Sequence, residues 1–321
     1  MDVLFVCDPP ETFSPAADST LVMIDEAVRR GHRPYCALLE DLALRVDQAW
    51  VRADALRIER TAAGLVAHRE RAGAWRSMAE FGAVIMRKDP PFDQGYLTAT
   101  WILDRAQSPV FNAPAGLRDF NEKLSLAQFP DLAPKTYVAR ESTEIRRILA
   151  ELGGRMILKP VFGYGGREVL LARHDDPNLG SLIELATAEG TRWTIAQEYL
   201  PDATRGDKRI LMVDGEPIGA VLRVGVPGEV RNNFHAGGKP AVSELDDADR
   251  RICARVGPVL RERGQFFVGL DVIGGRLTEI NVTSPTGMQE INRLGGLEDD
   301  ATMQARFWQG LERKLGARAR T

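Results

Sequence analysis

The 321-residue sequence contains only three cysteines and no long apolar run, and both absences narrow the class of protein. Cys7, Cys36 and Cys253 are odd in number and far apart, which favours buried thiols in a reducing compartment and excludes a zinc spacing. No apolar stretch approaches membrane-spanning length, and the N-terminus MDVLFVCDPP lacks the basic region and cleavage site of a signal peptide. The sequence therefore predicts a cytoplasmic protein with no membrane partner.

A broad basic surface is also missing, because 42 lysine and arginine residues are set against 45 aspartate and glutamate residues, for a net charge of −3. This balance argues against a nucleic-acid partner. The content of 44% hydrophobic and 27% charged residues is ordinary for a globular enzyme. A chain of this length favours two or three packed units over one core.

The common nucleotide-binding turns of α/β proteins are absent as well. The first predicted strand–helix turn, residues 8–11 (DPPE), has no glycine, and no GxxxxGK[ST] segment occurs anywhere. The dinucleotide fingerprint and the phosphate loop are therefore excluded. The four histidines form no recognisable Ser/His/Asp arrangement, so covalent catalysis by a triad is not indicated either.

Strand and helix patterns alternate in the first third of the chain, as in a parallel α/β unit. Strands are predicted at 2–7, 33–39, 82–88 and 109–114, and helices at 18–31 and 98–106. The first helix is capped by Asp18 or Ser19 and ends at Gly31. Residues 46–78 fit either short strands or a helix.

The remaining two thirds mix strands with helices in a pattern typical of α+β units. Helices are predicted at 117–129, 142–154, 179–190, 244–264 and 303–315, and strands at 135–140, 155–162, 167–173 and 194–200. Residues 208–224 predict a hairpin with Asp214-Gly215 at its turn. The glycine-containing stretch 225–240 is long for a compact domain, so it is either a functional lid or a surface linker.

The segment 163–166 (GYGG) lies between two predicted strands, where glycines let backbone N–H groups approach a phosphate. A plain hairpin turn would have the same composition. Lys159 precedes it inside the apolar strand RMILKPV, and a buried lysine needs an anion such as phosphate. Lys123 either points a second ammonium into the same cleft or is a solvated helix residue.

The stretch 269–287 (GLDVIGGRLTEINVTSPTG) reads as a hairpin that carries Asp271, Glu279 and Asn281 among apolar residues. A two-residue turn at 274–275 would put Asp271 and Glu279 on opposite faces. A three-residue loop, 274–276, pairs Asp271 with Glu279 and Leu270 with Ile280, which gives one apolar and one polar face. The sequence therefore favours the three-residue loop.

Three oxygen donors on one face suit Mg²⁺, with nucleotide phosphates completing its shell. The alternative is a polar surface paired with lysine or arginine. The phosphate-binding features at Lys159 and 163–166 favour the metal. If so, Asp271 and Glu279 are expected to repel each other in the metal-free protein.

Taken together, these segments resemble the ATP-grasp superfamily and, within it, the bacterial glutathione synthetase family. The stretches that carry the resemblance run in family order along nearly the whole chain: MRKDPPFD (86–93), LRDFNEKL (117–124), ILKP (157–160), GYGG (163–166), GDKRILMVDGEPIGA (206–220) and VGLDVIGGRLTEINVTSPTG (268–287). The resemblance implies an ATP-grasp fold, with a pre-ATP-grasp α/β domain at 1–122, a central lid subdomain at 123–200 and a C-terminal subdomain at 201–316.

The resemblance also implies roles for individual residues. Those matching ATP-binding positions are Lys123, Lys159, Gly163, Tyr164, Gly165, Gly166, Gln197, Glu198, Tyr199, Leu200 and Asp207. Asp271, Glu279 and Asn281 match Mg²⁺ ligands, for which Mn²⁺ is a possible substitute, and Arg209 and Arg223 match catalytic arginines near the transferred phosphate. The substrate-binding set is Arg87, Ser19, Arg231, Ser284, Pro285 and Thr286.

The implied reaction joins γ-glutamylcysteine to glycine through an acyl phosphate, with release of ADP and phosphate. The implied assembly is a homo-oligomer, a tetramer in relatives. Phe162, Ala16-Ala17 and His235 depart from residues common in the family, and the last two departures bear on substrate identity. An ATP-grasp ligase for another small peptide or amino-acid pair is the alternative, and a regulatory protein that binds nucleotide without catalysis is a rival of another class.

Overall fold

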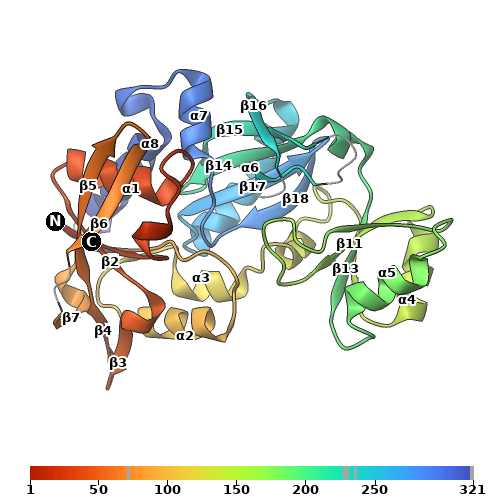
Figure 1. Ribbon diagram of the computed structural model, residues 1–321, viewed down its shortest axis with the longest axis horizontal. Coiled ribbons are helices and arrows are strands. Elements are labelled where there is room, and N and C mark those ends of the chain that lie inside the picture. Colours follow the sequence, from red (N-terminus) through yellow and green to blue (C-terminus); the bar gives the residue numbers. More distant parts are fainter. Residues whose placement is uncertain (71–72, 227–230, 235–236, 319–321) are drawn as a thin grey trace.

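The computed structural model describes residues 1–70, 73–226, 231–234 and 237–318. Figure 1 shows an N-terminal sheet with its helices on one side, a large sheet in the middle, and a smaller strand-and-helix unit that projects on the other side. Among the described residues, none of the helices has the length and apolar character needed to cross a membrane.

The N-terminal sheet contains six strands in the order β6-β5-β2-β1-β8-β9. Four of them are parallel, as predicted: β2 (Arg33–Ala37), β1 (Asp2–Val6), β8 (Ala83–Met86) and β9 (Val110–Phe111). Residues 46–78, whose sequence fits either short strands or a helix, form strands. Two of them, β5 (Asp54–Thr61) and β6 (Gly64–Glu70), extend this sheet in antiparallel fashion. Two others, β4 (Gln48–Arg52) and β7 (Trp75–Ser77), join β3 (Leu42–Arg45) in a three-stranded sheet.

The first helix, α1 (Ser19–Arg29), starts and stops where its sequence predicts. Asp18 is its N-cap and accepts hydrogen bonds from the N–H groups of Thr20 and Leu21, and Gly31 follows its end with a φ of +77°. The last helix, α8 (Met303–Arg318), packs on α1: the buried Trp308 donates its indole N–H to the carbonyl of Met23. Helix α8, from the C-terminal end of the sequence, therefore packs beside α1 from the N-terminal end.

The prediction of one helix over 117–129 is wrong, because the helix is interrupted in its middle. Helix α3 (Pro114–Asp119) ends early, and a 3₁₀ helix, η4 (Leu124–Gln128), follows. The Asn121 side chain accepts hydrogen bonds from the N–H groups of Lys123 and Leu124, which starts the second helix. The carbonyl of Glu122 accepts from Ile280 of a distant strand. These bonds hold 121–122 in a non-helical conformation beside that strand.

The projecting unit consists of one four-stranded antiparallel sheet and two helices on one face (Figure 1). Its strand order is β10-β13-β11-β12, with β10 (Thr136–Ala139), β13 (Thr194–Glu198), β11 (Arg155–Pro160) and β12 (Leu170–Arg173). The helices are α4 (Ser142–Glu151) and α5 (Leu179–Thr187). All were predicted, although β12 is shorter than its segment.

The central sheet has five antiparallel strands in the order β16-β15-β14-β17-β18. They are β16 (Lys239–Val242), β15 (Glu216–Val224), β14 (Asp207–Val213), β17 (Phe267–Ile273) and β18 (Arg276–Asn281). Its helices are α6 (Asp247–Glu262) and α7 (Met288–Gly295), of which α7 was not predicted. Helix α2 (Gln94–Leu103), capped by Asp93, completes the N-terminal part.

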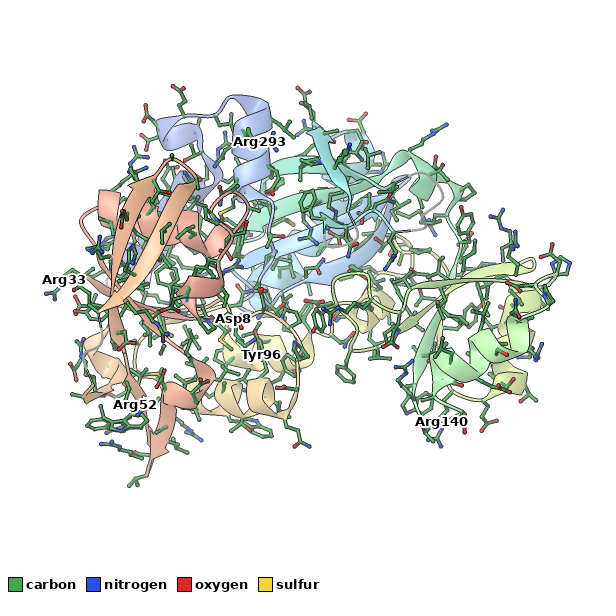
Figure 2. The ribbon with its side chains drawn as sticks, in the orientation of Figure 1. Asp8, Arg33, Arg52, Tyr96, Arg140 and Arg293 are labelled. Carbon is green, nitrogen blue, oxygen red and sulfur yellow. The ribbon has the colours of Figure 1, made fainter. Side chains whose placement is uncertain are left out.

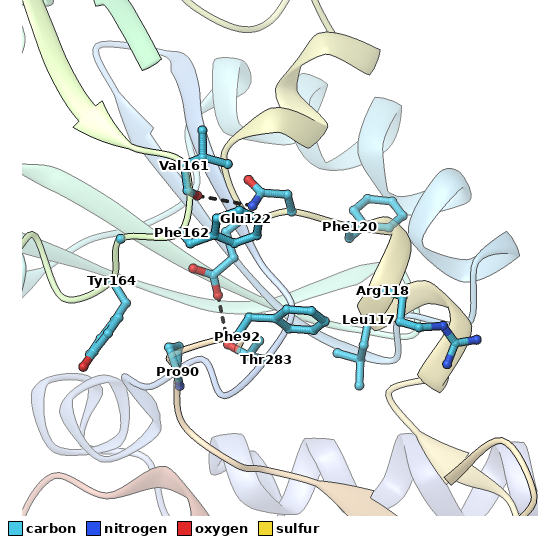
Figure 3. A pocket seen from close by; sticks show the side chains of 12 residues that line it. Pro90, Phe92, Leu117, Arg118, Phe120, Glu122, Val161, Phe162, Tyr164 and Thr283 are labelled. Carbon is cyan, nitrogen blue, oxygen red and sulfur yellow. Dashed lines mark hydrogen bonds between the residues drawn. The ribbon is translucent and has the colours of Figure 1, made fainter. Parts of the chain in front are cut away.

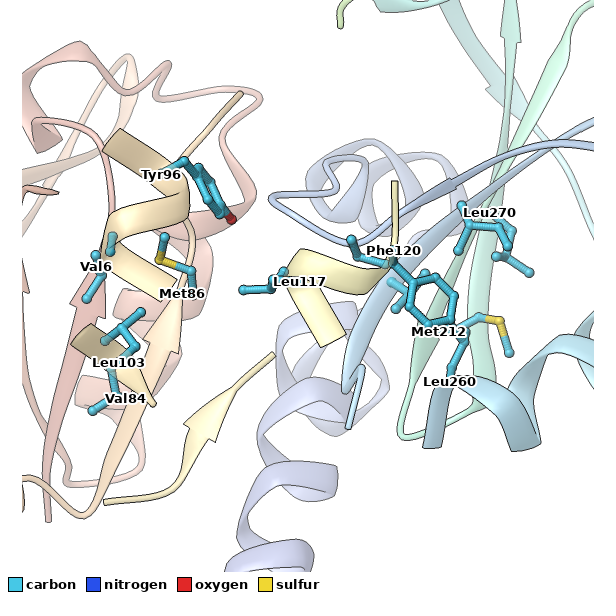
Figure 4. Close-up of a cluster of buried hydrophobic side chains, with 14 of the residues drawn as sticks. Val6, Val84, Met86, Tyr96, Leu103, Leu117, Phe120, Met212, Leu260 and Leu270 are labelled. Atoms are coloured by element: carbon cyan, nitrogen blue, oxygen red, sulfur yellow. The ribbon is translucent and has the colours of Figure 1, made fainter. Parts of the chain in front are cut away.

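The N-terminal and central sheets share hydrophobic cores, whereas the projecting unit has its own. Figure 4 shows one shared cluster, which runs from Val84 and Leu103 through Leu117 and Phe120 to Leu270. The side chain of Asn112 also binds both backbone groups of Phe267 and the carbonyl of Val282 across this boundary. The projecting unit encloses a separate cluster drawn only from residues 139–196.

Surface and interior side chains are clearly separated. Arg33, Arg52 and Arg140 extend from the outside of the molecule, whereas Tyr96 is buried between the N-terminal sheet and the centre (Figure 2). The three cysteines are free and buried, as expected, and burial raises the pKa of each thiol.

Candidate active site

A large cleft lies where the projecting unit, the central sheet and the N-terminal part meet. The predicted residues on its wall are Lys123, Lys159, Gly163, Tyr164, Gly165, Gly166, Arg209, Arg223, Asp271, Glu279, Asn281, Ser284, Pro285 and Thr286. They come from strands of two different sheets and from three loops, so the fold brings together residues as far apart in the chain as Lys123 and Thr286. The polar groups predicted for phosphate, metal and substrate therefore share one space.

A second pocket opens beside this cleft, between the projecting unit and the central sheet. Apolar walls come from Ile157, Val169, Leu200 and Ile273. The predicted residues on its wall are Lys159, Gly166, Gln197, Glu198, Tyr199, Leu200, Asp207, Arg223, Arg231, Asp271 and Glu279. A pocket that combines apolar walls with charged and polar side chains suits a nucleotide base with its sugar and phosphates.

Three buried polar atoms of residues that line this second pocket lack hydrogen-bond partners within the described part of the chain. They are Oδ1 of Asp207, Nε of Arg223 and Oδ1 of Asn233. The other oxygen of Asp207 accepts a hydrogen bond from Arg223. An unpaired buried polar atom costs about 1–3 kcal/mol. A ligand with hydroxyl groups, such as a ribose, would satisfy Asp207 and Arg223.

The two predicted phosphate lysines converge on one carboxylate. The ammonium groups of Lys159 and Lys123 lie 3.5 and 3.8 Å from Oε1 of Glu279. Lys123 also donates to the carbonyl of Gly163, at 2.5 Å. Burial lowers the pKa of Lys159, and the neighbouring Glu279 opposes that effect. Two buried ammonium groups with one carboxylate leave positive charge for an anion.

The glycine segment 163–166 faces this pair of lysines and has the conformation that glycine permits. Gly165 and Gly166 have φ values of +61° and +72°. A Cβ on Gly166 would lie 2.6 Å from the Asn233 side chain, and one on Gly163 would lie 2.5 Å from Pro160. The segment is therefore tightly enclosed, unlike an open hairpin turn.

The hairpin of β17 and β18 has the predicted pairing but reaches it differently. Asp271 pairs directly with Glu279, and Leu270 with Ile280, so the two carboxylates share a face. The predicted three-residue loop is wrong, because Ile273 pairs with Arg276 across a two-residue turn. The register shifts by one at a bulge that contains Thr278, which restores the pairing of Asp271 with Glu279.

Asp271 belongs to a buried ion-pair cluster with both predicted catalytic arginines. Arg209 donates to its two oxygens at 2.5 and 3.0 Å, and Arg223 lies 2.9 Å from Oδ2. Burial alone would raise the pKa of Asp271, but the two arginines outweigh it and lower that pKa. Asp271 and Glu279 each lie beside cations of their own, which reduces the repulsion expected between them in the metal-free protein.

These residues are chemically suited to a hard divalent cation at the cleft. Three oxygen-bearing side chains, Asp271, Glu279 and Asn281, lie on one face, and Asn281 turns its amide nitrogen toward the carbonyl of Gly269 at 3.4 Å. Its amide oxygen is then left for other contacts. No group of three His, Cys, Asp or Glu residues suited to a metal occurs in the described ranges. A cation here would need oxygens from a ligand, as Mg²⁺ in nucleotide sites does.

The predicted substrate residues lie in and behind another part of the wall. Ser284, Pro285 and Thr286 line the cleft, and Ser284 hydrogen-bonds to Asp89. Arg87 is buried behind them, with Nη2 3.2 Å from the carbonyl of Pro285. Its Nη1 has no partner within the described residues, and burial lowers its pKa.

Ser19 and Arg231 lie away from this wall. Ser19 is fully buried in α1 and accepts a hydrogen bond from the N–H of Met288, while its neighbour Asp18 lines the cleft. Arg231 lines the nucleotide pocket instead. The proposed lid at 225–240 includes residues 227–230 and 235–236, which lie outside the described residues, as does the departure at His235.

Glu122 is a cleft residue that the sequence patterns did not single out as functional. Its carboxylate accepts a hydrogen bond from Thr283, and burial raises its pKa (Figure 3). It also lines an apolar recess with Phe92 and Phe162. The signal available was its place in NEK, directly before Lys123. Glu290, another cleft residue, lies on the unpredicted helix α7.

Comparison with known sequences covers nearly the whole chain. Residues 1–118 match the family described as prokaryotic glutathione synthetase, N-terminal domain, and residues 122–296 match prokaryotic glutathione synthetase, ATP-grasp domain. The chain is 42% identical to the glutathione synthetase of Synechococcus elongatus over 317 residues, covering 95% of this chain and 98% of that protein. It is 40% identical to the glutathione synthetase of Vibrio cholerae over 318 residues, covering 98% of both.

Solved structures with the same fold are more distant in sequence. The D-cycloserine synthetase DcsG is 16% identical, with a TM-score of 0.70, and covers 98% of this chain and 100% of that chain. A RimK domain ATP-grasp protein from Sphaerobacter thermophilus is 18% identical, with a TM-score of 0.62, and covers 96% and 99%. These similarities confirm the predicted ATP-grasp fold.

Proposed function

The chain belongs to the prokaryotic glutathione synthetase family, and from that premise we propose how its cleft joins γ-glutamylcysteine to glycine. The enzyme is an ATP-dependent ligase that forms glutathione, with release of ADP and phosphate. Lys123 and Lys159 lie on one side of the cleft, and their ammonium groups lie beside Glu279 of the β17–β18 hairpin on the other side. This contact is the observation that supports the assignment of residues.

ATP occupies the pocket between the projecting unit and the central sheet in this proposal. The base lies between Ile157, Leu200 and Ile273, beside the backbone of 197–200. The ribose satisfies the unpaired atoms of Asp207 and Arg223. The phosphates then reach Lys123, Lys159 and the N–H groups of 163–166, whose glycines permit close approach.

Asp271, Glu279 and Asn281 would hold Mg²⁺, or Mn²⁺ in its place, against the phosphates. The metal supplies positive charge that stabilises the phosphoryl oxygens during transfer. Lys159 and Lys123, which lie 3.5 and 3.8 Å from Glu279, would supply two further cations for the phosphates. Asp271 keeps Arg209 and Arg223 oriented at the reacting end.

The chemistry requires activation because a carboxylate is a poor acyl donor. An oxygen of the cysteinyl carboxylate attacks the γ-phosphorus, the bond to ADP breaks, and an acyl phosphate forms. The amine of glycine then attacks the acyl carbon, loses a proton, and phosphate leaves. Arg209 and Arg223 stabilise the oxyanion of the tetrahedral state, since fixed cationic donors act strongly in a buried site.

Several further features remain predictions of the resemblance. They are the domain limits 1–122, 123–200 and 201–316, the cytoplasmic location, the homotetramer, and substrate contacts of Ser19 and Arg231. The small-molecule substrates follow from the family.

The test is an assay of the purified chain with ATP, Mg²⁺, γ-glutamylcysteine and glycine. Equal amounts of ADP and glutathione are expected, and omission of either substrate should stop tripeptide formation. Efficient turnover only with another donor–acceptor pair would reassign the substrates within the ATP-grasp ligases. Nucleotide binding without turnover of any pair would support a regulatory protein instead.

Glu279→Gln tests the metal assignment. Activity should fall by about 100-fold or more, because a hard anionic ligand is lost, and the Mg²⁺ concentration for half-maximal rate should rise. The metal-free protein should also lose stability, because two buried ammonium groups lose the carboxylate that they share. A Mg²⁺ dependence identical to that of the wild type would remove Glu279 from the metal site.

A further inference from the structure

An apolar recess lies beside the cleft, between the projecting unit and the N-terminal part (Figure 3). One wall consists of Val161 and Phe162, which directly follow β11 of the projecting unit. The other wall is formed by Phe92, Leu117 and Phe120, and the last two belong to the core that the N-terminal and central sheets share. The recess therefore spans the boundary between the two units.

The size and lining of the recess suit a small ligand with an apolar body. It holds about 450 Å³ of space free of protein atoms, part of it open to solvent, which is within the range of small-molecule sites. Phe162 is 66% exposed, whereas Leu117 and Phe120 are buried. An apolar ring between these side chains would cover Phe162 and gain the free energy of apolar burial.

Glu122 gives the recess a negative charge. Its Oε1 accepts a hydrogen bond from Thr283 at 2.9 Å. Among the residues that the structure describes, no cation forms an ion pair with this carboxylate, because the adjacent Lys123 directs its ammonium to Gly163 and Glu279. A carboxylate half-buried beside aromatic rings is unfavourable without a cation, so this lining favours a cationic ligand with an apolar body.

Two other polar side chains of the lining have partners of their own. Arg118 pairs with Asp104 at 2.6 Å, so its charge is balanced within the protein. Asn121 donates to the carbonyl of Val161 at 3.2 Å. Because this hydrogen bond joins the two walls, a ligand beside it contacts the projecting unit and the shared core at once.

We propose that the recess binds a small alkyl- or arylammonium ion, with its apolar body between Phe92 and Phe162 and its ammonium at Oε2 of Glu122. Such a ligand contacts both units, so its binding holds them together. The nucleotide pocket lies between the same two units, and its opening involves movement of one relative to the other. The ligand is therefore a regulator that slows turnover without occupying the nucleotide pocket.

Benzylamine is the probe, and benzyl alcohol is its uncharged counterpart. Calorimetric titration of the whole protein, with saturating ADP, Mg²⁺ and γ-glutamylcysteine, should show binding of benzylamine and much weaker binding of benzyl alcohol. Glu122→Gln should weaken benzylamine binding about tenfold or more, because a charge-assisted contact is lost, and should leave benzyl alcohol unaffected. Phe162→Ala should weaken binding of both probes. Trp193→Ala, which removes an exposed aromatic side chain outside the recess, is the control.

In the glutathione assay, benzylamine should lower kcat and leave the KM values for ATP and for both substrates unchanged, and Phe162→Ala should remove this inhibition. Competition with ATP or with either substrate would place the probe in the cleft, and an amide of benzylamine as product would make the recess an acceptor site. Either result would overturn the inference, as would equal binding of the two probes or binding without inhibition.

The outcome does not depend on one variant or on the proposed reaction. If Glu122→Gln does not fold, Phe162→Ala, at an exposed position, decides through its effect on both probes. The titration requires no turnover, so it tests the site whichever substrates the enzyme uses. Failure of the proposed function would instead appear as an absence of glutathione in assays without benzylamine.

Discussion

Lys159 shows how much chemistry a single residue of this chain carries. It lies in a buried antiparallel sheet, yet its closest anion is Glu279 of a different sheet. The lysine is 6% exposed, and burial lowers its pKa. A cation placed in this way is unfavourable unless a ligand supplies more negative charge than one shared carboxylate.

Lys159→Met should therefore reduce function more than stability. The methionine keeps the packing of the stem and removes a cation that has an incomplete set of anions. We expect kcat/KM for ATP to fall about 10- to 100-fold, with the melting temperature unchanged or slightly raised. Steady-state kinetics and thermal melts measure both. Lys314→Met, on α8 outside the cleft, is the control, and identical ATP kinetics in the two variants would refute the phosphate role of Lys159.

The carboxyl group of Asp18 leads to a prediction of how stability depends on pH. Burial raises its pKa, so the folded protein holds this proton to a higher pH than the unfolded chain does. The stability that the Asp18 carboxyl contributes to the wild type is therefore fully present below its ordinary pKa. This contribution decreases as pH rises through the pKa that Asp18 has in the folded protein. Asp18→Asn keeps an N-cap acceptor without the charge.

The melting temperature of Asp18→Asn relative to wild type should consequently increase between about pH 4 and pH 7, by a few degrees at most. Melts across this range provide the measurement. A difference that is constant with pH, or that favours the wild type more at pH 7, would show that the charged cap stabilises α1.

At the scale of elements, the glycine segment 163–166 connects a rigid strand to the phosphate site. It follows β11, where Lys159 lies, and its Gly166 has a φ of +72° against the side chain of Asn233. A positive φ is strained for any residue with a Cβ, and a Cβ at this position would also meet the Asn233 side chain. The segment is thus a place where a single methyl group should disturb ligand binding.

Gly166→Ala should raise the KM for ATP about tenfold or more, because the methyl displaces Asn233 or moves the N–H groups. Gly153→Ala is a matched control: Gly153 has a φ of +77° in the same unit but open space around it. Both variants should lose about 1 kcal/mol of stability from backbone strain, and only Gly166→Ala should lose ATP affinity. Equal ATP kinetics would reduce the segment to a turn.

The β17–β18 hairpin shows that two different turns can produce the same cross-strand pair. A two-residue turn and a bulge at Thr278 give the same cross-strand pair as a longer loop without a bulge. The residue pattern specifies which side chains share a face, because burial of the apolar face dominates the energy. It does not specify where the extra residue is placed.

For the whole molecule, the arrangement of cores predicts two cooperative units. The N-terminal and central sheets share clusters that cross from one to the other, whereas residues 139–196 enclose a core of their own. The nucleotide pocket lies between these two units. Opening of this pocket by movement of the projecting unit would expose little of either core.

Two matched leucine variants test this division. Leu149→Ala, in α4, and Leu260→Ala, in α6, both remove a buried helical leucine and should each cost about 2–5 kcal/mol. We expect hydrogen exchange to rise only within residues 136–198 for Leu149→Ala. For Leu260→Ala, it should rise in both the central and the N-terminal sheets. Uniform acceleration in both variants would indicate a single cooperative unit.

Much of the architecture was predictable from the sequence alone, because local patterns fix it. The capping of α1 by Asp18, the Asp214-Gly215 turn and the apolar periodicity of β11, β13 and β14 each depend on neighbours within a few positions. The candidate site was likewise predictable as a set of residue types: a lysine in an apolar strand, a glycine turn, and a polar stripe on one hairpin.

Tertiary structure alone decided how those residues meet. The break at 120–122 depends on the local cap formed by Asn121 and also on the hydrogen bond from the Ile280 N–H of β18 to the Glu122 carbonyl, a distant contact that no local pattern encodes. Asp271 lies beside Arg209 and Arg223, and Glu279 lies beside two lysines, so each carboxylate has cationic partners that the sequence did not reveal. Electrostatic energy depends on distance in space, so the sequence determines which charges are present and the fold determines which of them are partners.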